Sequence, residues 1–209
     1  MSASPDNAPA VTTVVFDVGG VLLDWDPRYL YRHLLPDDAA VEHFLSTVCT
    51  NDWNLRQDAG RLWDEAVAEL TAQHPHHAEL IAAYHHRWPE MLNGAIQGTV
   101  DILEALRAKG TPLYAITNFS TEKWALAQEM FPFLRGFRGV TVSGVVKLIK
   151  PDPAIYRHFF DSFGVDPATA VFIDDNPANV VASQEAGMRA IRFRSPEQLR
   201  AELLALGLL

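Results

Sequence analysis

The chain has 209 residues, of which 48% are hydrophobic and 21% are charged, with a formal net charge of −9 and a single cysteine, Cys49. This composition is typical of a folded enzyme with one α/β core and a small accessory domain, and it excludes a disordered chain. The acidic balance argues against nucleic acid or an anionic membrane surface as partner, because both are bound by clustered Lys and Arg. A lone cysteine forms no intrachain disulfide, and we interpret Cys49 as a packing residue rather than a nucleophile.

The first ten residues are small and polar, and we expect residues 1–10 to form a mobile tail. They lack the basic start and apolar run of a signal peptide, and no stretch of the chain approaches the roughly 18 apolar residues of a membrane span. We therefore expect a cytoplasmic protein whose partner is a small molecule.

Five apolar segments alternate with helical patterns in the rest of the chain. Such continuous apolar runs, rich in β-branched residues, are typical of strands buried on both faces. Strands alternating with helices predict right-handed crossovers and an α/β fold, a Rossmann-like parallel sheet flanked by helices. The predicted strands are residues 11–16, 112–117, 139–142, 170–173 and 189–193, and the predicted helices are residues 100–109, 121–130, 153–163, 179–186 and 195–206.

The interval from residue 26 to residue 93 breaks this alternation. It contains no convincing strand but several amphipathic stretches, such as residues 62–70 and 78–88. We expect an inserted helical bundle over residues 26–93, which leaves residues 11–25 and 94–209 to the α/β core. The two crossing points, near residues 24–27 and 93–99, are expected to act as hinges.

Two groups of side chains in this interval have plain structural interpretations. The histidines between residues 74 and 86 lack a cysteine or clear carboxylate to complete a tetrahedral site, so we do not interpret them as metal ligands. The aromatic residues are expected to form the core of the bundle rather than a stacking platform, although one of them could line a substrate pocket. They are Trp53, Trp63, Tyr84 and Trp88.

Asp17 is the most informative residue, because it places a carboxylate where the first predicted strand ends. It is followed closely by Gly19 and Gly20, whose small size lets backbone N–H groups approach a bound anion. A carboxylate at such a point can attack an electrophile or hold a cation.

Polar groups of complementary chemistry follow later apolar segments, at Thr117-Asn118, Lys150-Pro151 and Asp174-Asp175. Each of these pairs alone is typical of a turn or a helix cap. Ligands of open parallel sheets, however, bind outside the carboxyl ends of the strands, so all four segments can converge on one site.

With these four motifs in this order, the chain resembles the haloacid dehalogenase superfamily of hydrolases from about residue 14 to about residue 193. It is most similar to the capped sugar-phosphate phosphatases, in which a helical cap follows the first motif, and to the amino-terminal phosphatase domain of soluble epoxide hydrolases. The resemblance implies a hydrolase that cleaves a small phosphate monoester, with a sugar phosphate as the favoured class, through an aspartyl-phosphate intermediate. In this interpretation the inserted bundle is the cap that closes over the site.

The resemblance also implies roles for individual residues. Asp17 is the implied nucleophile, and Lys150 is the implied catalytic cation that pairs with it and with the phosphoryl oxygens. The implied phosphate-binding groups are the backbone N–H groups of Val18 and Gly19 and the side chains of Thr117 and Asn118.

A Mg²⁺ cofactor is implied as well. Its implied ligands are the Asp17 carboxylate, the Gly19 carbonyl and a carboxylate of the last motif, with Asp175 favoured over Asp174 as the direct ligand. Asp174 and Asn179 would then hydrogen-bond to ligands or coordinated waters.

The chain departs from the family pattern at Gly19, where most of the phosphatases carry an aspartate that serves as general acid and base. General acid–base catalysis contributes about 10²- to 10⁴-fold, so the loss is expected to slow the reaction without abolishing it. Asp24, Asp26 or a metal-bound water could replace the acid, although capping before Pro27 is the favoured interpretation of the two aspartates.

Two other functions stay open. A 2-haloacid dehalogenase uses the same aspartate without a metal, but such enzymes carry Tyr at the position of Gly19 and lack the Asp174-Asp175 pair. A non-catalytic ligand-binding or regulatory protein would explain the missing acid as a decayed site. Mg²⁺-dependent turnover of a phosphate ester separates both from the phosphatase.

Overall fold

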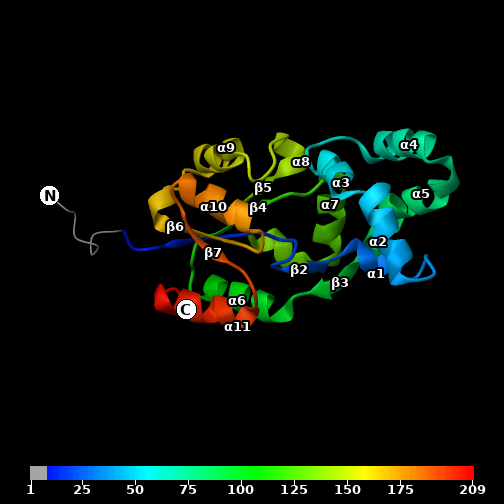
Figure 1. Ribbon diagram of the computed structural model, residues 1–209. Helices are drawn as coiled ribbons and strands as arrows, with labels where there is room; N and C mark the ends of the chain where they lie inside the picture. The colour runs from blue at the N-terminus through cyan, green and yellow to red at the C-terminus, as the bar shows by residue number, and fades with distance from the viewer. Residues whose placement is uncertain (1–8) are drawn as a thin grey trace.

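The computed structural model describes residues 9–209, so the predicted mobile tail lies almost entirely outside the described residues. The centre is a five-stranded parallel sheet in the order β5-β4-β1-β6-β7 (Figure 1). Each strand falls on a predicted segment, and the predicted α/β fold is confirmed. The strands are β1 (Thr13–Phe16), β4 (Leu113–Thr117), β5 (Gly139–Val142), β6 (Ala170–Asp174) and β7 (Arg189–Arg192).

Side chains of the central strands alternate between two hydrophobic clusters, one on each face of the sheet. Val14 and Phe16 of β1 belong to one cluster, whereas Val15 belongs to the other. Helices α6 (Gln97–Ala108) and α11 (Pro196–Ala205) cover the first face (Figure 1). Helices α9 (Pro153–Phe163) and α10 (Pro177–Glu185) cover the second face. Burial on both faces explains why these strands are apolar at successive positions.

Four of the six described helices of the α/β core begin at side-chain caps that the sequence supplies. Asp152 and Asn176 accept hydrogen bonds from the first turns of α9 and α10, and a proline follows each cap. The Asn176 cap starts α10 two residues before the start predicted from the sequence. The remaining core helices are α7 (Thr121–Met130), the unpredicted α8 (Ser143–Val146), α9 (Pro153–Phe163) and α10 (Pro177–Glu185).

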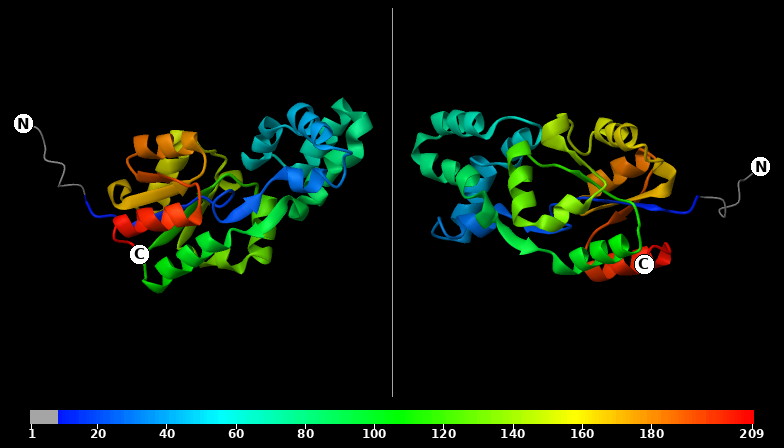
Figure 2. Two further views of the ribbon diagram at one scale, coloured as in Figure 1. Left: turned by 60° about the horizontal axis from the view of Figure 1, so that its bottom comes forward. Right: turned by 180° about the vertical axis from the view of Figure 1, so that it is seen from behind.

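Five α-helices lie between strands β2 (Leu23–Trp25) and β3 (Leu92–Ala95), and we call this segment the helical insertion. It lies beyond the end of the sheet at which β1 ends (Figure 2). Its centre is aromatic: Trp53 packs edge-on against Trp63 and Tyr84, at ring-centroid distances of 5.6 and 5.2 Å. The domain boundaries at residues 26 and 93 stay a prediction. The helices are α1 (Pro27–Tyr31), α2 (Asp38–Thr47), α3 (Asn51–Asp58), α4 (Trp63–Gln73) and α5 (Ala78–His86), with 3₁₀ turns at Pro75–His77 and Trp88–Met91.

The expectation that residues 26–93 contain no strand is wrong at the carboxyl end of this interval. Strand β3 (Leu92–Ala95) begins inside this interval and pairs antiparallel with β2 (Leu23–Trp25). Both strands are very short and their register shifts within the pair, so neither leaves a periodic pattern in the sequence. The two expected hinges are therefore joined by one ribbon, which connects the sheet to the helical insertion.

Within residues 9–209, no helix combines the length and the apolar character needed to cross a bilayer. The cytoplasmic location and the exclusion of nucleic acid stay predictions.

The central strands predict where truncation harms the fold most. Phe172 of β6 is fully buried in the cluster beneath α9 and α10, so Phe172→Ala is expected to lower the free energy of unfolding by about 3–5 kcal/mol. Val181 of α10 is 52% exposed, and Val181→Ala is the matched control, expected to change stability by less than about 0.5 kcal/mol. Urea unfolding measures both, and equal effects would contradict this account of the core.

Candidate active site

Asp17, Lys150 and Asp174 meet at the carboxyl edge of the sheet. Asp17 follows β1, Asp174 ends the neighbouring β6, and Lys150 lies in the loop before α9. The Lys150 Nζ lies 2.8 Å from Asp17 Oδ1 and 2.7 Å from Asp174 Oδ2. All three residues are buried. The sequence prediction that these segments converge is thus reproduced in the structure.

The two aspartates of the last motif differ in their surroundings. Asp174 accepts hydrogen bonds from the Asn176 backbone N–H (2.8 Å) and from Asn179 Nδ2 (3.0 and 3.1 Å), in addition to its ion pair with Lys150. Asp175 is exposed and lies at the surface of the site. Asp174 is therefore held in place by the protein, whereas the Asp175 carboxylate has no side-chain partner among the described residues and can be reached by a ligand.

Three carboxylates face a single ammonium group at this site. Burial raises the pKa of Asp17, while Lys150 acts to lower it and Asp174 adds to the rise. Burial acts to lower the pKa of Lys150, but the two carboxylates outweigh it and the net change is upward. Burial, followed by the charge of Asp174, raises the pKa of Asp175. The cluster therefore holds more negative charge than Lys150 neutralises.

This cluster fits a hard divalent cation. Asp17, Asp174 and Asp175 each offer an oxygen, and these three atoms lie within 4.8 Å of one another. Mg²⁺ binds carboxylate and carbonyl oxygens and keeps several waters, so it suits a cluster of carboxylates at an edge that Asp175 leaves exposed.

The loop after Asp17 brings its backbone close to Asp175. Gly20 has a φ of +71°, and a Cβ at this residue would lie 2.7 Å from Asp175 Oδ2, so a side chain there would displace that carboxylate. At Gly19, in contrast, a Cβ would meet no atom within 4 Å. Gly19, the predicted site residue, therefore has room for a side chain, whereas Gly20 must be glycine.

Three predicted phosphate-binding groups have different surroundings in the structure. The Val18 backbone N–H donates to Asp17 Oδ1 at 2.7 Å, so it orients the carboxylate. Asn118 accepts from the Lys150 N–H (2.9 Å) and donates to the Lys150 carbonyl (3.1 Å), which fixes the backbone of the lysine. The buried hydroxyl of Thr117 has no hydrogen-bond partner within the described chain and is available to a ligand.

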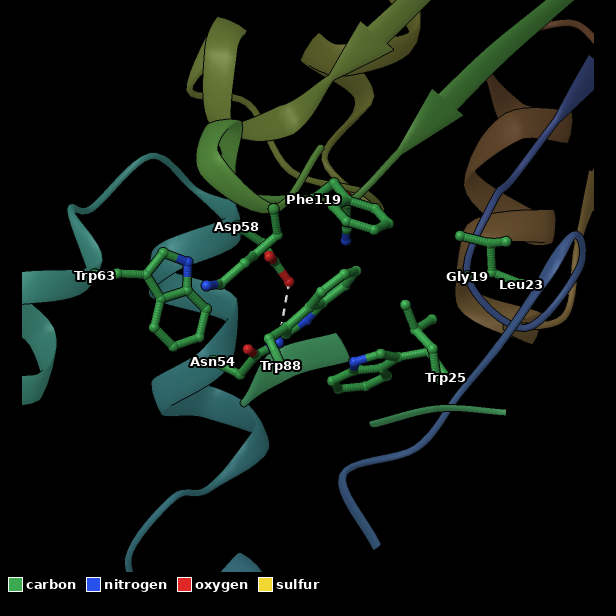
Figure 3. Close-up of a pocket in the computed structure, with 11 residues that line it drawn as sticks. Gly19, Leu23, Trp25, Asn54, Asp58, Trp63, Trp88 and Phe119 are labelled. Atoms are coloured by element: carbon green, nitrogen blue, oxygen red, sulfur yellow. Dashed lines mark hydrogen bonds between the residues drawn. The ribbon is translucent and has the colours of Figure 1, made fainter. Parts of the chain in front are cut away.

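A pocket opens between this edge of the sheet and the helical insertion (Figure 3). Gly19 and Asn118 line it from the core, together with four aromatic side chains and three polar ones that no sequence motif marked. Trp63 and Trp88 were expected to form the core of the insertion, with one aromatic residue able to line a pocket, and both are buried and line this pocket. The aromatic residues are Trp25, Trp63, Trp88 and Phe119, and the polar residues are Asn54, Asp58 and Lys123.

The candidates for a substitute acid have structural partners instead. Asp26 caps α1 by accepting from the Arg28 N–H at 2.9 Å, which confirms the capping interpretation. Asp24 accepts hydrogen bonds from the Tyr29 hydroxyl (3.0 Å) and from Asn93 Nδ2 (2.9 Å). Both aspartates thus stabilise the ribbon and the first helix.

Two ionisable groups of the pocket, the half-buried Asp58 and the buried Lys123, have shifted pKa values. Burial raises the pKa of Asp58 to about 7, although hydrogen bonds from the Ser120 backbone and Asn54 act to lower it. Burial lowers the pKa of Lys123 to about 8, and its Nζ lies 2.8 Å from His85 Nδ1 and 5.2 Å from the Trp63 ring centroid.

Comparison with known proteins identifies relatives of the whole chain. Residues 11–187 match the family model described as haloacid dehalogenase-like hydrolase. The sesquiterpene phosphatase astK of Aspergillus oryzae is 27% identical over 83% of this chain and 85% of its own length. The validoxylamine A 7′-phosphate phosphatase of Streptomyces hygroscopicus subsp. limoneus is 26% identical over 90% of this chain and 87% of its own.

Other relatives are longer. Flavin mononucleotide hydrolase 1 of Arabidopsis thaliana is 27% identical over 54% of this chain, and the match spans 46% of that protein.

Solved structures share the fold at low identity. A HAD family enzyme of Bacteroides thetaiotaomicron, solved with magnesium and inorganic phosphate, aligns with a TM-score of 0.70 and 20% identity over 89% of this chain and 96% of its own. The L-2-haloacid dehalogenase of Xanthobacter autotrophicus aligns with a TM-score of 0.64 and 17% identity over 93% of this chain and 83% of its own.

The raised pKa of Asp58 predicts how stability depends on pH. The folded state disfavours the ionised carboxyl, so the penalty is absent below about pH 4, grows as the pH rises toward 7, and is constant above that. Asp58→Asn removes the penalty. Between about pH 4 and about pH 8, the variant is expected to gain about 1–3 kcal/mol in free energy of unfolding relative to wild type, a range reduced for the solvent that the pocket admits.

Urea unfolding at the two pH values checks this expectation. Asp52→Asn, at an exposed position on the same helix, is the matched control and should show no comparable change. A constant difference between Asp58→Asn and wild type would mean that Asp58 ionises as freely in the folded chain as in the unfolded chain.

Proposed function

The chain belongs to the haloacid dehalogenase-like hydrolases, as its motifs predicted, and from this premise we propose that it is a Mg²⁺-dependent phosphatase of a small phosphate monoester. The observation that carries the proposal is Asp17, a buried carboxylate oriented by Lys150 and by the Val18 N–H at the carboxyl edge of the sheet. Two relatives that span most of the chain are named as phosphatases, which supports the same chemistry. A sugar phosphate stays our proposed substrate class.

Asp17 has the position and partners of a nucleophile. The Lys150 ammonium and the Val18 N–H both contact Asp17 Oδ1. The remaining oxygen is the one that would attack phosphorus, forming an aspartyl-phosphate while the ester oxygen leaves; water then cleaves the acyl phosphate. Lys150 would also neutralise the incoming phosphoryl oxygens, and the free hydroxyl of Thr117 would donate to one of them.

The residues that would hold Mg²⁺ are Asp17, the carbonyl of Gly19 and Asp175, with Asp174 and Asn179 supporting them. When bound, the ion would supply positive charge that lets an anionic ester approach an acidic site. The chain prepares for this by leaving Asp175 exposed at the site and by fixing Asp174 with three donor groups, the Asn176 N–H, the Asn179 amide and the Lys150 ammonium.

A dehalogenase is the second candidate, because solved dehalogenases share this fold and the pocket is largely aromatic. The pair Asp174-Asp175 argues against it. A metal-free site gains nothing from a third carboxylate placed beside Asp17, since an uncompensated charge raises the cost of burial.

The first test concerns Asp17. Asp17→Asn keeps the shape of the side chain but removes the nucleophile and a metal ligand, so kcat for an aryl phosphate is expected to fall at least about 10³-fold. Removal of divalent cations from the wild type should abolish the same activity. The control is the urea unfolding curve of the variant, which should show an intact fold.

Three outcomes would count against the proposal. Undiminished turnover by Asp17→Asn would exclude the covalent route. Turnover of a halogenated acid after chelation, with none of any phosphate ester, would establish the dehalogenase instead. Mg²⁺ binding without turnover of any ester would favour the non-catalytic alternative.

The second test restores the missing acid at Gly19, where a side chain would meet no neighbouring atom. Gly19→Asp is expected to raise kcat for alkyl phosphates, whose leaving groups need protonation, by about tenfold or more. The gain for an activated aryl phosphate should be small. Gly19→Asn is the matched control without a proton donor of this kind, and an equal gain in both variants would show that acid catalysis is not what the site lacks.

A further inference from the structure

The residues that line the pocket beside the site change in character from one end of the pocket to the other. Figure 3 shows Gly19 on one side, Asp58 and Asn54 on the opposite side, and Trp25 and Trp88 between them. A phosphate bound near Gly19 would therefore direct its leaving group past the two indole rings toward Asp58.

The middle of the pocket suits a ring. Trp88 and Phe119 pack edge-on with ring centroids 5.7 Å apart, so the wall they form is held rigidly. Leu23 and Leu92 add aliphatic surface to the same pocket. Flat apolar walls bind the faces of ring systems with little loss of conformational entropy, whereas a flexible chain must be ordered on binding.

The far end is polar and has unused hydrogen-bonding capacity. Asp58 accepts from Asn54 Nδ2 at 3.1 Å and from the Ser120 backbone, which leaves the second N–H of the Asn54 amide and the remaining lone pairs of the carboxyl. In the pocket wall, the buried indole Nε1–H of Trp25 has no partner among the residues described. Buried polar groups are unfavourable when they stay unsatisfied, so a substrate with polar substituents would compensate for them.

We propose that the pocket selects a phosphate ester whose leaving group is a ring with a hydroxyl group on the side away from the phosphate, and that Asp58 binds this hydroxyl. The proposal rests on the proposed phosphatase function and names its substrate class. Asp58 is a specificity residue in this scheme, since it contacts the leaving group far from the reacting bond.

Two other classes of leaving group fit the pocket less well. A purely apolar leaving group would bury the far end against Asp58 and Asn54 without giving either a partner. A cationic leaving group would pair with Asp58, but it would meet the Lys123 ammonium in the same pocket. A hydroxyl both donates and accepts, so it matches a carboxyl together with an amide N–H.

The test compares two esters that differ by one hydroxyl, trans-4-hydroxycyclohexyl phosphate and cyclohexyl phosphate. The measured quantity is the ratio of their kcat/KM values, expected to favour the hydroxylated ester by about tenfold or more in wild type. In Asp58→Ala the ratio should fall to within about threefold of unity, and in Asp58→Asn, which keeps hydrogen-bonding atoms, it should lie between. Asp52→Asn, exposed on the same helix, should keep the wild-type ratio.

Hexyl phosphate and choline phosphate complete the panel, and p-nitrophenyl phosphate reports the basal chemistry. A wild-type ratio near unity, or one that Asp58→Ala leaves unchanged, would overturn the proposal while the phosphatase function stands. Preference for hexyl phosphate or for choline phosphate over the hydroxylated ring would also overturn it. Failure to hydrolyse any ester, p-nitrophenyl phosphate included, would remove the phosphatase function and this proposal together.

Discussion

The ion pairs of Lys150 with Asp17 and Asp174 are the interaction on which the site depends. Three buried ionic groups are costly to remove from water, and leaving one of them unpaired costs about 3–5 kcal/mol. The fold therefore holds each of them in place: Asn118 fixes the lysine backbone, Asn179 fixes Asp174, and the sheet fixes both aspartates at neighbouring strand ends. The same cluster retains excess negative charge, which gives it an affinity for a divalent cation.

The second constraint is the junction between the sheet and the helical insertion. The ribbon of β2 and β3 connects the two and contributes Trp25 and Leu92 to the pocket. Ser143 Oγ donates to the Asp58 carbonyl, and Trp63 Nε1 donates to Ser120 Oγ at 2.8 Å, so the insertion is hydrogen-bonded to the core beside the pocket. In the proposed function the reaction takes place at the sheet edge, and residues of the insertion and the ribbon would bind the leaving group.

Much of the fold and of the reacting centre could be predicted from the sequence. Strands buried on both faces leave continuous apolar runs, and the ends of neighbouring strands place Asp17 and Asp174 at one edge without any knowledge of packing. Lys150 lies in the loop before α9, and the order of the motifs predicted its place in the site. The ribbon could not be predicted, because pairs of three or four residues carry no periodicity. The role proposed for Asp58 could not be predicted either. Asp58 ends a helix that is polar in sequence, and it becomes a pocket residue only because α3 packs against the core.

Asn118 and Val18 show a further limit of sequence reasoning. The Asn118 side chain and the Val18 backbone N–H could both bind phosphate, but their hydrogen bonds are made to Lys150 and Asp17. Only coordinates distinguish a ligand-binding group from one that positions its neighbour. The account depends most directly on Asp17 as the covalent nucleophile. Its most direct test is acid quenching of the Mg²⁺-loaded enzyme during turnover of a phosphate ester labelled in the phosphoryl group, followed by peptide mapping. A labelled phosphoryl group on the peptide that contains Asp17, absent in Asp17→Asn, is the predicted result; turnover with no label on the protein, or with label on another residue, would contradict it.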